Sequence, residues 1–248
     1  MRAPVLRHGA LAPALALGLA PAAHGDVRVG IGLVALRDAD PYLGVEDAWS
    51  ALPLPLLETG RLSVFGPRAA FRLAGGGTTA LELVAGWNFA GFEATDSEAL
   101  AGLEDRDGSL LAGFALTREG ALGELALDVL GDVADTHGGA VATLTAARPF
   151  AVAGGRLVPS LALRWQGAGY RAYYFGVSGE EVTAALPAHA PGAGVDLELG
   201  LGWTRPLGAH HRVLLDAVAT ALADSVADGP LVEDDLAVRL AAGWLYEF

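Results

Sequence analysis

Residues 235–248 read DLAVRLAAGWLYEF, and this stretch decides the fold. Every second position is apolar or aromatic, namely Leu236, Val238, Leu240, Ala242, Trp244, Tyr246 and Phe248. The positions between them are mostly small or charged. Because side chains in a strand alternate between its two faces, the pattern predicts a strand with one apolar face and one mixed face. Its fourteen residues exceed the roughly 5–6 usual in soluble proteins and suffice for a bilayer, which takes about 9–11 tilted residues.

Aromatic residues are concentrated at the end of this stretch, where Trp244, Tyr246 and Phe248 share one face. An aromatic girdle at the membrane interface is typical of outer-membrane β-barrels. We therefore expect residues 235–248 to be the closing strand of such a barrel. A buried strand of a soluble sandwich is the alternative for this stretch taken alone.

Alternation of period two recurs along the whole chain. The further alternating segments are Val27–Leu36, Thr79–Phe89, Ser109–Arg118, Leu122–Gly131, Gly139–Arg148, Arg156–Trp165, Val195–Arg205 and His211–Ala221. On the seventh of these we expect Leu199 to face lipid and Glu198 to face the barrel interior. The connections alternate in length, as periplasmic turns and outer loops do. Short ones are Arg118–Ala121, Pro149–Gly155 and Pro206–His210, and long ones are Ala90–Asp107, Gln166–Gly194 and Leu222–Asp234.

The fold class is therefore all-β, an antiparallel transmembrane barrel of 10 to 12 strands. A plain count that includes Ala51–Leu57 and Leu62–Leu73 gives eleven, whereas secreted bacterial barrels have even counts. Ten strands follow if Ala51–Leu57 does not cross the membrane, since its two prolines lack donors for the strand ladder. Twelve follow if Gly66-Pro67 divides Leu62–Leu73 into two strands, and this count is slightly favoured.

The first 25 residues have the features of a secretory signal peptide. Arg2 and Arg7 precede an apolar run, and the small residues in Ala23-His24-Gly25 suit cleavage after Gly25. An uncleaved membrane anchor is the alternative. We therefore expect residues 1–25 to be removed and residues 26–248 to form one outer-membrane barrel domain.

The composition excludes several classes of protein. The chain has 29 acidic and 16 basic residues, a formal net charge of −13 and no lysine. Phosphate binding needs clustered lysine or arginine, so we expect no nucleic-acid partner. Because the chain has no cysteine, it must close its own core or barrel without disulfide bonds. A hydrophobic content of 52% agrees with apolar residues spread over many alternating strands.

Four short motifs carry a resemblance to a known family. They are Asp40-Pro41-Tyr42-Leu43-Gly44, Leu52-Pro53-Leu54-Pro55-Leu56, Tyr173-Tyr174-Phe175-Gly176-Val177-Ser178 and Asp228-Gly229-Pro230-Leu231-Val232. In this order and spacing they resemble the MltA-interacting protein (MipA/OmpV) family over the whole mature chain. The last motif departs from the family pattern, because Gly229 stands where the family usually has serine.

The resemblance implies an outer-membrane barrel of the Gram-negative cell envelope. For the best-known member it implies a scaffold that holds a lytic transglycosylase of the murein sacculus near a bifunctional peptidoglycan synthase. Other members resemble adhesins, or porins linked to permeability and stress. The family brings no catalytic residues, so we expect no enzyme activity, no cofactor and no metal.

The ionisable residues of the predicted loops form no catalytic or metal-binding motif. Ser178 could approach His137 only through folding, so a catalytic triad cannot be inferred from spacing. We expect His137 and the charged run Glu104-Asp105-Arg106-Asp107 to be solvated. We expect the same of Glu180-Glu181, with divalent-cation bridges to lipopolysaccharide as the alternative for this pair.

Charged residues of both signs fall on the inward register of the predicted strands. They are Glu82, Glu124, Asp128, Arg156, Arg164, Asp196, Glu198, Asp216, Arg239 and Glu247. In a barrel of this size they can pair across the lumen and fill it. The alternative is a narrow channel for small polar solutes, in which the solute would meet Arg156, Arg164, Asp196, Glu198, Asp216 and Arg239.

The longest predicted loop holds an aromatic block, Tyr173, Tyr174 and Phe175. Aromatic side chains supply a large contact area at low entropic cost, so we expect the block to form a lid over the barrel mouth. The alternative is that it extends the preceding strand above the membrane. A scaffold, a channel and an adhesin all remain open from the sequence, and only the family resemblance favours the scaffold.

Overall fold

The computed structural model describes residues 27–39 and 41–248. The predicted signal peptide, residues 1–25, and its cleavage site after Gly25 lie outside the described residues, as does Asp40 of the first family motif. Among the described residues, no helix combines the length and the apolar character needed to span a membrane.

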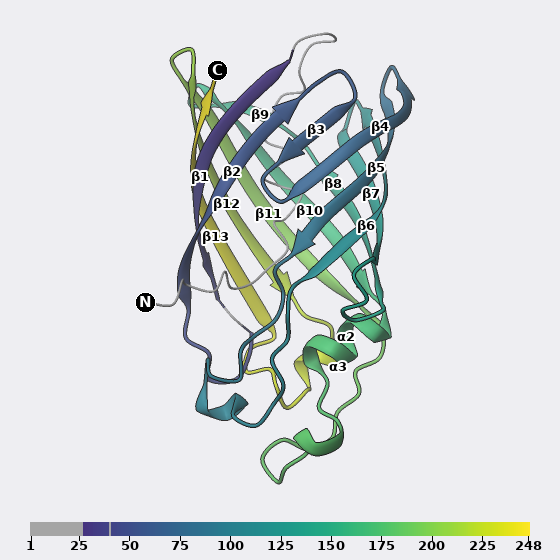
Figure 1. Ribbon diagram of the computed structural model, residues 1–248. Helices are drawn as coiled ribbons and strands as arrows, with labels where there is room; N and C mark the ends of the chain where they lie inside the picture. Colours follow the sequence, from purple (N-terminus) through teal and green to yellow (C-terminus); the bar gives the residue numbers. More distant parts are fainter. Residues whose placement is uncertain (1–26, 40) are drawn as a thin grey trace.

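The chain forms a closed antiparallel β-barrel of twelve strands (Figure 1). The labelled strands are β1 (Arg28–Asp38), β2 (Ala48–Glu58), β3 (Leu62–Phe65), β4 (Arg68–Gly76), β5 (Thr79–Asn88), β6 (Ser109–Gly120), β7 (Gly123–Asp132), β8 (Ala140–Ala147), β9 (Phe150–Val152), β10 (Gly155–Gln166), β11 (Gly194–Leu207), β12 (His211–Ala221) and β13 (Leu236–Glu247). Strands β8 and β9 pair with β10 in one unbroken register, so they are two pieces of a single strand. Pairing of β1 with β13 closes the barrel and confirms the predicted fold class.

Side chains alternate across the barrel wall as the sequence pattern predicts. On β13, Leu240 and Trp244 are exposed on the outer surface, whereas Leu245 is fully buried inside. On β11, Leu199 is 57% exposed and its neighbour Glu198 only 9% exposed. The predicted lipid-facing and lumen-facing registers are therefore confirmed for both strands.

The strands β2, β3 and β4 decide between the two strand counts. Gly66 has a positive φ of 55°, which glycine adopts at little cost, and with Pro67 it forms the turn that separates β3 from β4. Twelve strands are therefore correct. The ten-strand alternative is wrong, because Ala51–Leu57 lies within β2, which pairs with β1 along its full length.

The two ends of the barrel differ in their connections. Turns of two residues, such as Gly77-Thr78 and Ala121-Leu122, lie at the end that holds the C-terminus (top of Figure 1). The opposite end carries the long connections and the helices η1 (Glu98–Leu100), α2 (Ala168–Phe175), η2 (Gly179–Glu181) and α3 (Asp224–Ala227). Short periplasmic turns and long outer loops are the rule for this class, so we call the two ends the periplasmic end and the outer end.

The seam between the first and last strands is held by four ionic side chains at the periplasmic end. Arg28 on β1 lies 2.8 Å from Glu247 on β13 and 2.6 Å from Glu58 on β2. Glu247 also accepts a hydrogen bond of 2.6 Å from Arg212 on β12. One carboxylate thus links the two arginines that flank the seam.

Replacing Glu247 by glutamine is expected to lower the free energy of unfolding by about 1.5–3 kcal/mol, the usual range for hydrogen bonds to charged groups. The change leaves Arg28 and Arg212 without their shared carboxylate. A reversible denaturant titration in lipid vesicles measures the effect, with Glu180→Gln on an exposed outer loop as the control. Equal stability of the two variants would show that the seam does not depend on this network.

Candidate functional site

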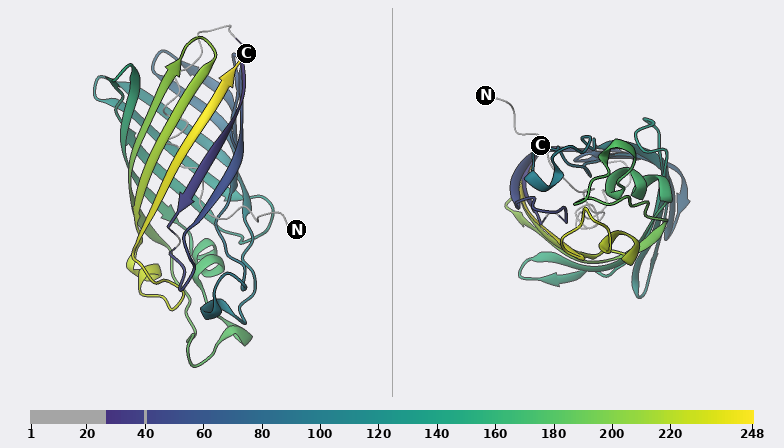
Figure 2. Two further views of the ribbon diagram at one scale, coloured as in Figure 1. Left: turned by 90° about the vertical axis from the view of Figure 1, so that its left-hand side faces the viewer. Right: turned by 90° about the horizontal axis from the view of Figure 1, so that it is seen from below.

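The outer mouth of the barrel is closed by its own loops. The connections 41–47, 89–108, 167–193 and 222–235, which we call the plug, lie across the ring of strands (Figure 2). Their buried apolar residues form one cluster with residues at the outer ends of the strands. Its members are Tyr42, Phe92, Leu100, Leu103, Leu111, Val141, Tyr170, Tyr174, Phe175, Val177, Leu186, Val226 and Leu231.

Helix α2 is the central element of the plug. It begins after Gly167 and ends at Phe175, and the N–H of the next residue, Gly176, donates to the Ala172 carbonyl. Residues four apart lie on the same side of a helix, and accordingly Tyr170 and Tyr174 are both buried. The aromatic block Tyr173–Phe175 is thus helical and packs inward, so it does not extend the preceding strand.

A buried arginine fastens α2 to the barrel wall. Arg171 is fully buried (0% exposed) and lies 2.5 Å from Asp196 on β11. It also donates a hydrogen bond of 2.7 Å to Ser225 on α3. The backbone N–H of Ala223 donates to the same Asp196 oxygen, at 3.0 Å. One ion pair therefore joins the helix, the wall and the last outer loop.

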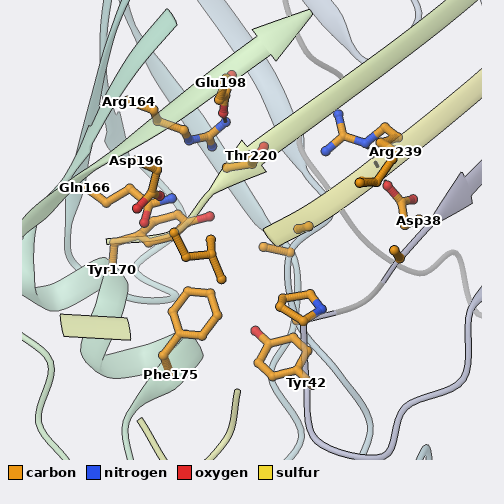
Figure 3. A pocket seen from close by; sticks show the side chains of 17 residues that line it. Asp38, Tyr42, Arg164, Gln166, Tyr170, Phe175, Asp196, Glu198, Thr220 and Arg239 are labelled. Atoms are coloured by element: carbon orange, nitrogen blue, oxygen red, sulfur yellow. Dashed lines mark hydrogen bonds and ion pairs between the residues drawn. The ribbon is translucent and has the colours of Figure 1, made fainter. Parts of the chain in front are cut away.

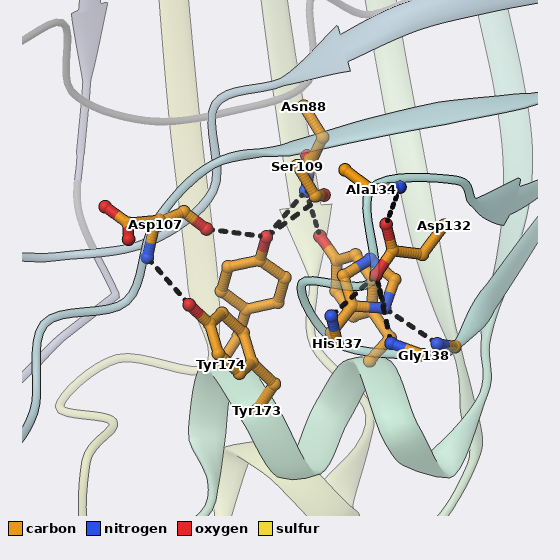
Figure 4. A network of polar contacts seen from close by, with 11 residues as sticks. Asn88, Asp107, Ser109, Asp132, Ala134, His137, Gly138, Tyr173 and Tyr174 are labelled. Carbon is orange, nitrogen blue, oxygen red and sulfur yellow. Dashed lines mark hydrogen bonds and ion pairs between the residues drawn. The ribbon is translucent and has the colours of Figure 1, made fainter.

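The tyrosines of α2 take part in a polar network on the opposite wall (Figure 4). The Tyr174 hydroxyl donates to the Asp107 carbonyl at 3.0 Å and lies 3.2 Å from Ser109 Oγ. Asn88 donates to the hydroxyls of both Tyr170 and Tyr174, at 3.4 and 3.3 Å. Burial raises the pKa of Tyr174 far above its ordinary value, so this hydroxyl stays protonated as a donor.

His137 is not the solvated residue that we expected. Its side chain is fully buried and packs edge-on against Tyr170, with ring centroids 4.9 Å apart. Burial lowers the pKa of His137 although Asp132 lies nearby, so the ring is neutral at pH 7. Its Nδ1 accepts a hydrogen bond of 2.9 Å from the Gly139 N–H. His137 therefore packs against helix α2 of the plug.

The expectation of solvated loop charges is wrong for Arg106 and Glu181. The two side chains form an ion pair of 2.6 Å and are both largely buried. Arg106 also donates to the Tyr173 carbonyl, at 2.6 Å. Burial alone would raise the pKa of Glu181, but hydrogen bonds from Arg106 and from two backbone N–H groups outweigh it and lower the pKa.

Because the folded-state pKa of Glu181 lies below its ordinary value of 4.5, its contribution is complete above pH 4.5 and is lost as pH falls through the folded pKa. We expect amide protection in the loop 98–107 to fall in that acidic window. Hydrogen-exchange protection factors at several pH values measure it. Glu181→Gln, which lacks the charge, is expected to show low protection at every pH. A native-like pH profile in that variant would contradict the assignment.

A cavity of about 130 Å³ with charged, aromatic and aliphatic lining residues lies on the lumen side of the plug (Figure 3). Tyr42, Tyr170 and Phe175 contribute to it from the plug. The charged residues that line it come from the neighbouring strands β10, β11, β13 and β1, namely Asp38, Arg164, Asp196, Glu198 and Arg239. The cavity therefore combines an aromatic roof with walls that carry both signs of charge.

Four of the charged residues around the cavity form two ion pairs, each between neighbouring strands. Arg239 donates to Asp38 at 2.7 Å, and Arg164 lies 3.6 Å from Glu198. Among the described residues, the buried Arg164 Nε and Gln166 Oε1 have no hydrogen-bond partner. A small polar molecule in the cavity would find both a donor and an acceptor there.

The structure brings four of the six predicted lumen charges together at this cavity. They are Arg164, Asp196, Glu198 and Arg239. Arg156 and Asp216 lie on inward registers of β10 and β12 but do not line it. Sequence reasoning missed Gln166, which shares the inward register of Arg164, and Tyr42, which packs against Phe175 at 5.5 Å between centroids.

The described residues do not form an arrangement with obvious reaction chemistry. Within them, no group of three or more histidine, aspartate or glutamate side chains could hold a metal ion. Ser178 forms a capping box with Glu181 at the start of η2.

A family model described as MltA-interacting protein MipA matches residues 31–248. Among curated proteins, YiaT of Escherichia coli (strain K12), named as an outer membrane protein, is 24% identical over 233 residues. That match covers 93% of this chain and 94% of YiaT.

Solved structures of outer-membrane proteins are similar to this chain at low identity. An outer membrane channel of Pseudomonas putida F1 is 11% identical with a TM-score of 0.44, and the match covers 93% of this chain and 100% of the channel. OmpTdeltaL8, a loop-deletion mutant of an outer membrane protein of Vibrio cholerae, is 12% identical with a TM-score of 0.36. The match covers 88% of this chain and 62% of that mutant, so the chain spans less than two thirds of its length.

Proposed function

This chain belongs to the MltA-interacting protein MipA family and is located in the cell outer membrane, and from this premise we propose that it is a non-catalytic scaffold barrel for murein enzymes. The observation that carries the proposal is the closed outer mouth. The plug buries Tyr170, Arg171 and Tyr174 across the opening, and ion pairs occupy the lumen below. A barrel closed in this way is suited to presenting its surfaces to partners.

The family name suggests the lytic transglycosylase MltA as one partner, and the family resemblance adds a peptidoglycan synthase. Murein lies on the periplasmic side of this membrane, so these contacts belong at the periplasmic end. Leu122 is 85% exposed in a turn there. Leu122 also lines a groove of about 520 Å³ on the outside of the barrel wall, together with residues that include Leu125, Arg148 and Leu161. We assign the partner contact to Leu122 and this groove. Contacts with lipid and lipopolysaccharide use the exposed apolar belt of the barrel.

Binding of purified MltA to the full chain in lipid nanodiscs tests the scaffold proposal. Leu122→Asp is expected to weaken binding by at least about tenfold, which corresponds to 1.4 kcal/mol. Val182→Asp, on an exposed outer loop, is the matched control and is expected to bind like the native chain. No binding by the native chain, or equal weakening in both variants, would contradict the proposal.

The charged residues that line the cavity favour a second function, the passage of small polar solutes through a narrow path that the plug closes. In this function the aromatic block is a lid, and Arg164, Glu198, Arg239 and Asp38 line the path. Single-channel recording in planar bilayers, with the native chain and the Tyr173→Ala/Tyr174→Ala variant, tests it. A lid predicts conductance steps that are larger or more frequent in the variant, with unchanged heat-modifiable gel mobility. The absence of conductance steps with both proteins would contradict the channel function and leave the scaffold function as the remaining proposal.

A further inference from the structure

Strand pairing in the barrel wall is interrupted beside the outer part of β2. Strand β3 is only four residues long, and it pairs with the periplasmic part of β2 alone, from Glu58 to Leu56. Strand β4 meets β5 only as far as Gly86. Consequently the outer part of β2, residues 48–54, pairs with β1 on one side and with no strand on the other (Figure 1).

Two prolines lie on the open edge of β2. The Pro55 carbonyl accepts a hydrogen bond of 3.0 Å from the Gly66 N–H, so the backbone groups of Pro55 point toward β3 and the interruption. Every second residue of a strand points the same way, which places the missing donor of Pro53 on the same edge. Prolines in sheets are confined to such edges. This edge therefore cannot pair fully with an added strand.

The inner surface behind the interruption is apolar, unlike the charged walls around the cavity. Leu52, Leu54 and Leu56 point inward from β2 and are buried, with Leu54 fully enclosed. They share a cluster with Val34, Leu36, Leu214, Ala241 and Leu245. Phe65 from β3 and Phe89, just beyond β5, are partly buried and pack against this cluster. Phe65 ends β3 and Phe89 follows β5, so both phenylalanines lie beside the interruption.

The outer surface beside the interruption is continuous with the lipid-facing belt. Trp49 on β2 and Trp87 on β5 are exposed there, one on each side. An exposed ion pair between Arg37 and Asp47, 2.8 Å apart, lies next to Trp49 at the outer end of the strands. Tryptophan and charged residues typically mark the headgroup level, so Pro53 lies deeper, within the outer leaflet.

We propose that this interruption is a lateral binding site for one acyl chain of an outer-leaflet lipid, held between Pro53 and the rings of Phe65 and Phe89. Hydrocarbon is the immediate neighbour of this part of the wall in the membrane. The apolar residues behind it let a chain lie in the wall without meeting the charged lumen. The prolines remove donors at the depth where hydrocarbon could not satisfy them.

Photolabelling of the unaltered chain tests the site. The protein is reconstituted in phosphatidylcholine vesicles that contain phosphatidylcholine with a diazirine at the end of an acyl chain, and adducts are mapped by mass spectrometry. We expect adducts on Phe65 and Phe89 as well as on the lipid-facing Leu199. Val158, which is buried on the inner face of β10, is the internal control and is expected to stay unlabelled.

A second lipid, with the diazirine on its headgroup, separates an acyl chain from a headgroup. We expect it to label Trp49 and to leave Phe65 unlabelled. Labelling of Leu199 without Phe65 and Phe89 would overturn the proposal, and so would labelling of Phe65 by the headgroup probe alone. Labelling of Val158 at the level of Phe65 would also overturn it, because the probe would then reach the interior without a site. None of these outcomes depends on MltA binding or on conductance.

Discussion

Replacement of Arg171 by methionine is expected to release helix α2 from the barrel wall. Arg171 is fully buried, and its loss leaves Asp196 buried without its ion-pair partner, although the Ala223 N–H still donates to it. Removing one partner of a buried ion pair typically costs about 3–5 kcal/mol. The loss is local to the plug, because the strand pairs of the barrel do not include Arg171. The expected result is a folded barrel whose outer loops are no longer docked.

The measurement is hydrogen-exchange protection of residues 168–175, together with heat-modifiable gel mobility to show that the barrel itself is folded. The double variant Arg171→Met/Asp196→Leu is the control, because replacing a whole buried pair by apolar side chains is often close to neutral. Protection is expected to be lost in the single variant and largely recovered in the double variant. Native protection in Arg171→Met would mean that the tyrosine network alone seats the helix.

Leu199→Arg is expected to destabilise the whole barrel by about 2–4 kcal/mol, the cost of an arginine on the lipid face at mid-membrane depth. Leu199 lies near the middle of β11 and is exposed on the outer surface. A charge at this place loses its water without gaining a partner. Reversible denaturant titration in lipid vesicles gives the free energy of unfolding.

The matched control on the same strand is Glu198→Gln, which keeps the size of an inward side chain and removes its charge. Arg164 lies 3.6 Å from Glu198, a weak pair, so we expect this variant to lose less stability than Leu199→Arg. Equal losses, or a larger loss from Glu198→Gln, would mean that the two faces of β11 have been assigned the wrong way round.

The barrel itself was predictable from the sequence, because its period of two is a local property of each strand. Residues 235–248 identified both faces of β13, and the same rule placed Leu199 outside and Glu198 inside. The turn at Gly66-Pro67 was also readable, since glycine and proline in succession favour a turn. What the pattern did not show was that β3 stops halfway across the wall, because pairing partners depend on strand lengths elsewhere in the sheet.

The plug was less predictable because its contacts join distant parts of the chain. Arg106 and Glu181 lie in different loops, so their pairing has no local signal, and both had been expected to be solvated. His137 was misjudged for the same reason, since the tyrosines that bury it follow more than thirty residues later. The helical form of Tyr173–Phe175 was missed because aromatic residues also favour strands.

The pairing of β1 with β13 bears on the rates at which the barrel folds and unfolds. Every other strand pair joins neighbours along the chain, whereas β1 and β13 join residues as far apart as Arg28 and Glu247, 219 positions away. Local pairs form before distant ones, because a long loop loses more entropy on closure. We therefore expect the hairpins to form first and the pairing of β1 with β13 to form last. Contacts that form last affect the rate of unfolding more than the rate of folding. We therefore expect the Arg28–Glu247–Arg212 cluster to slow the unfolding of the closed barrel.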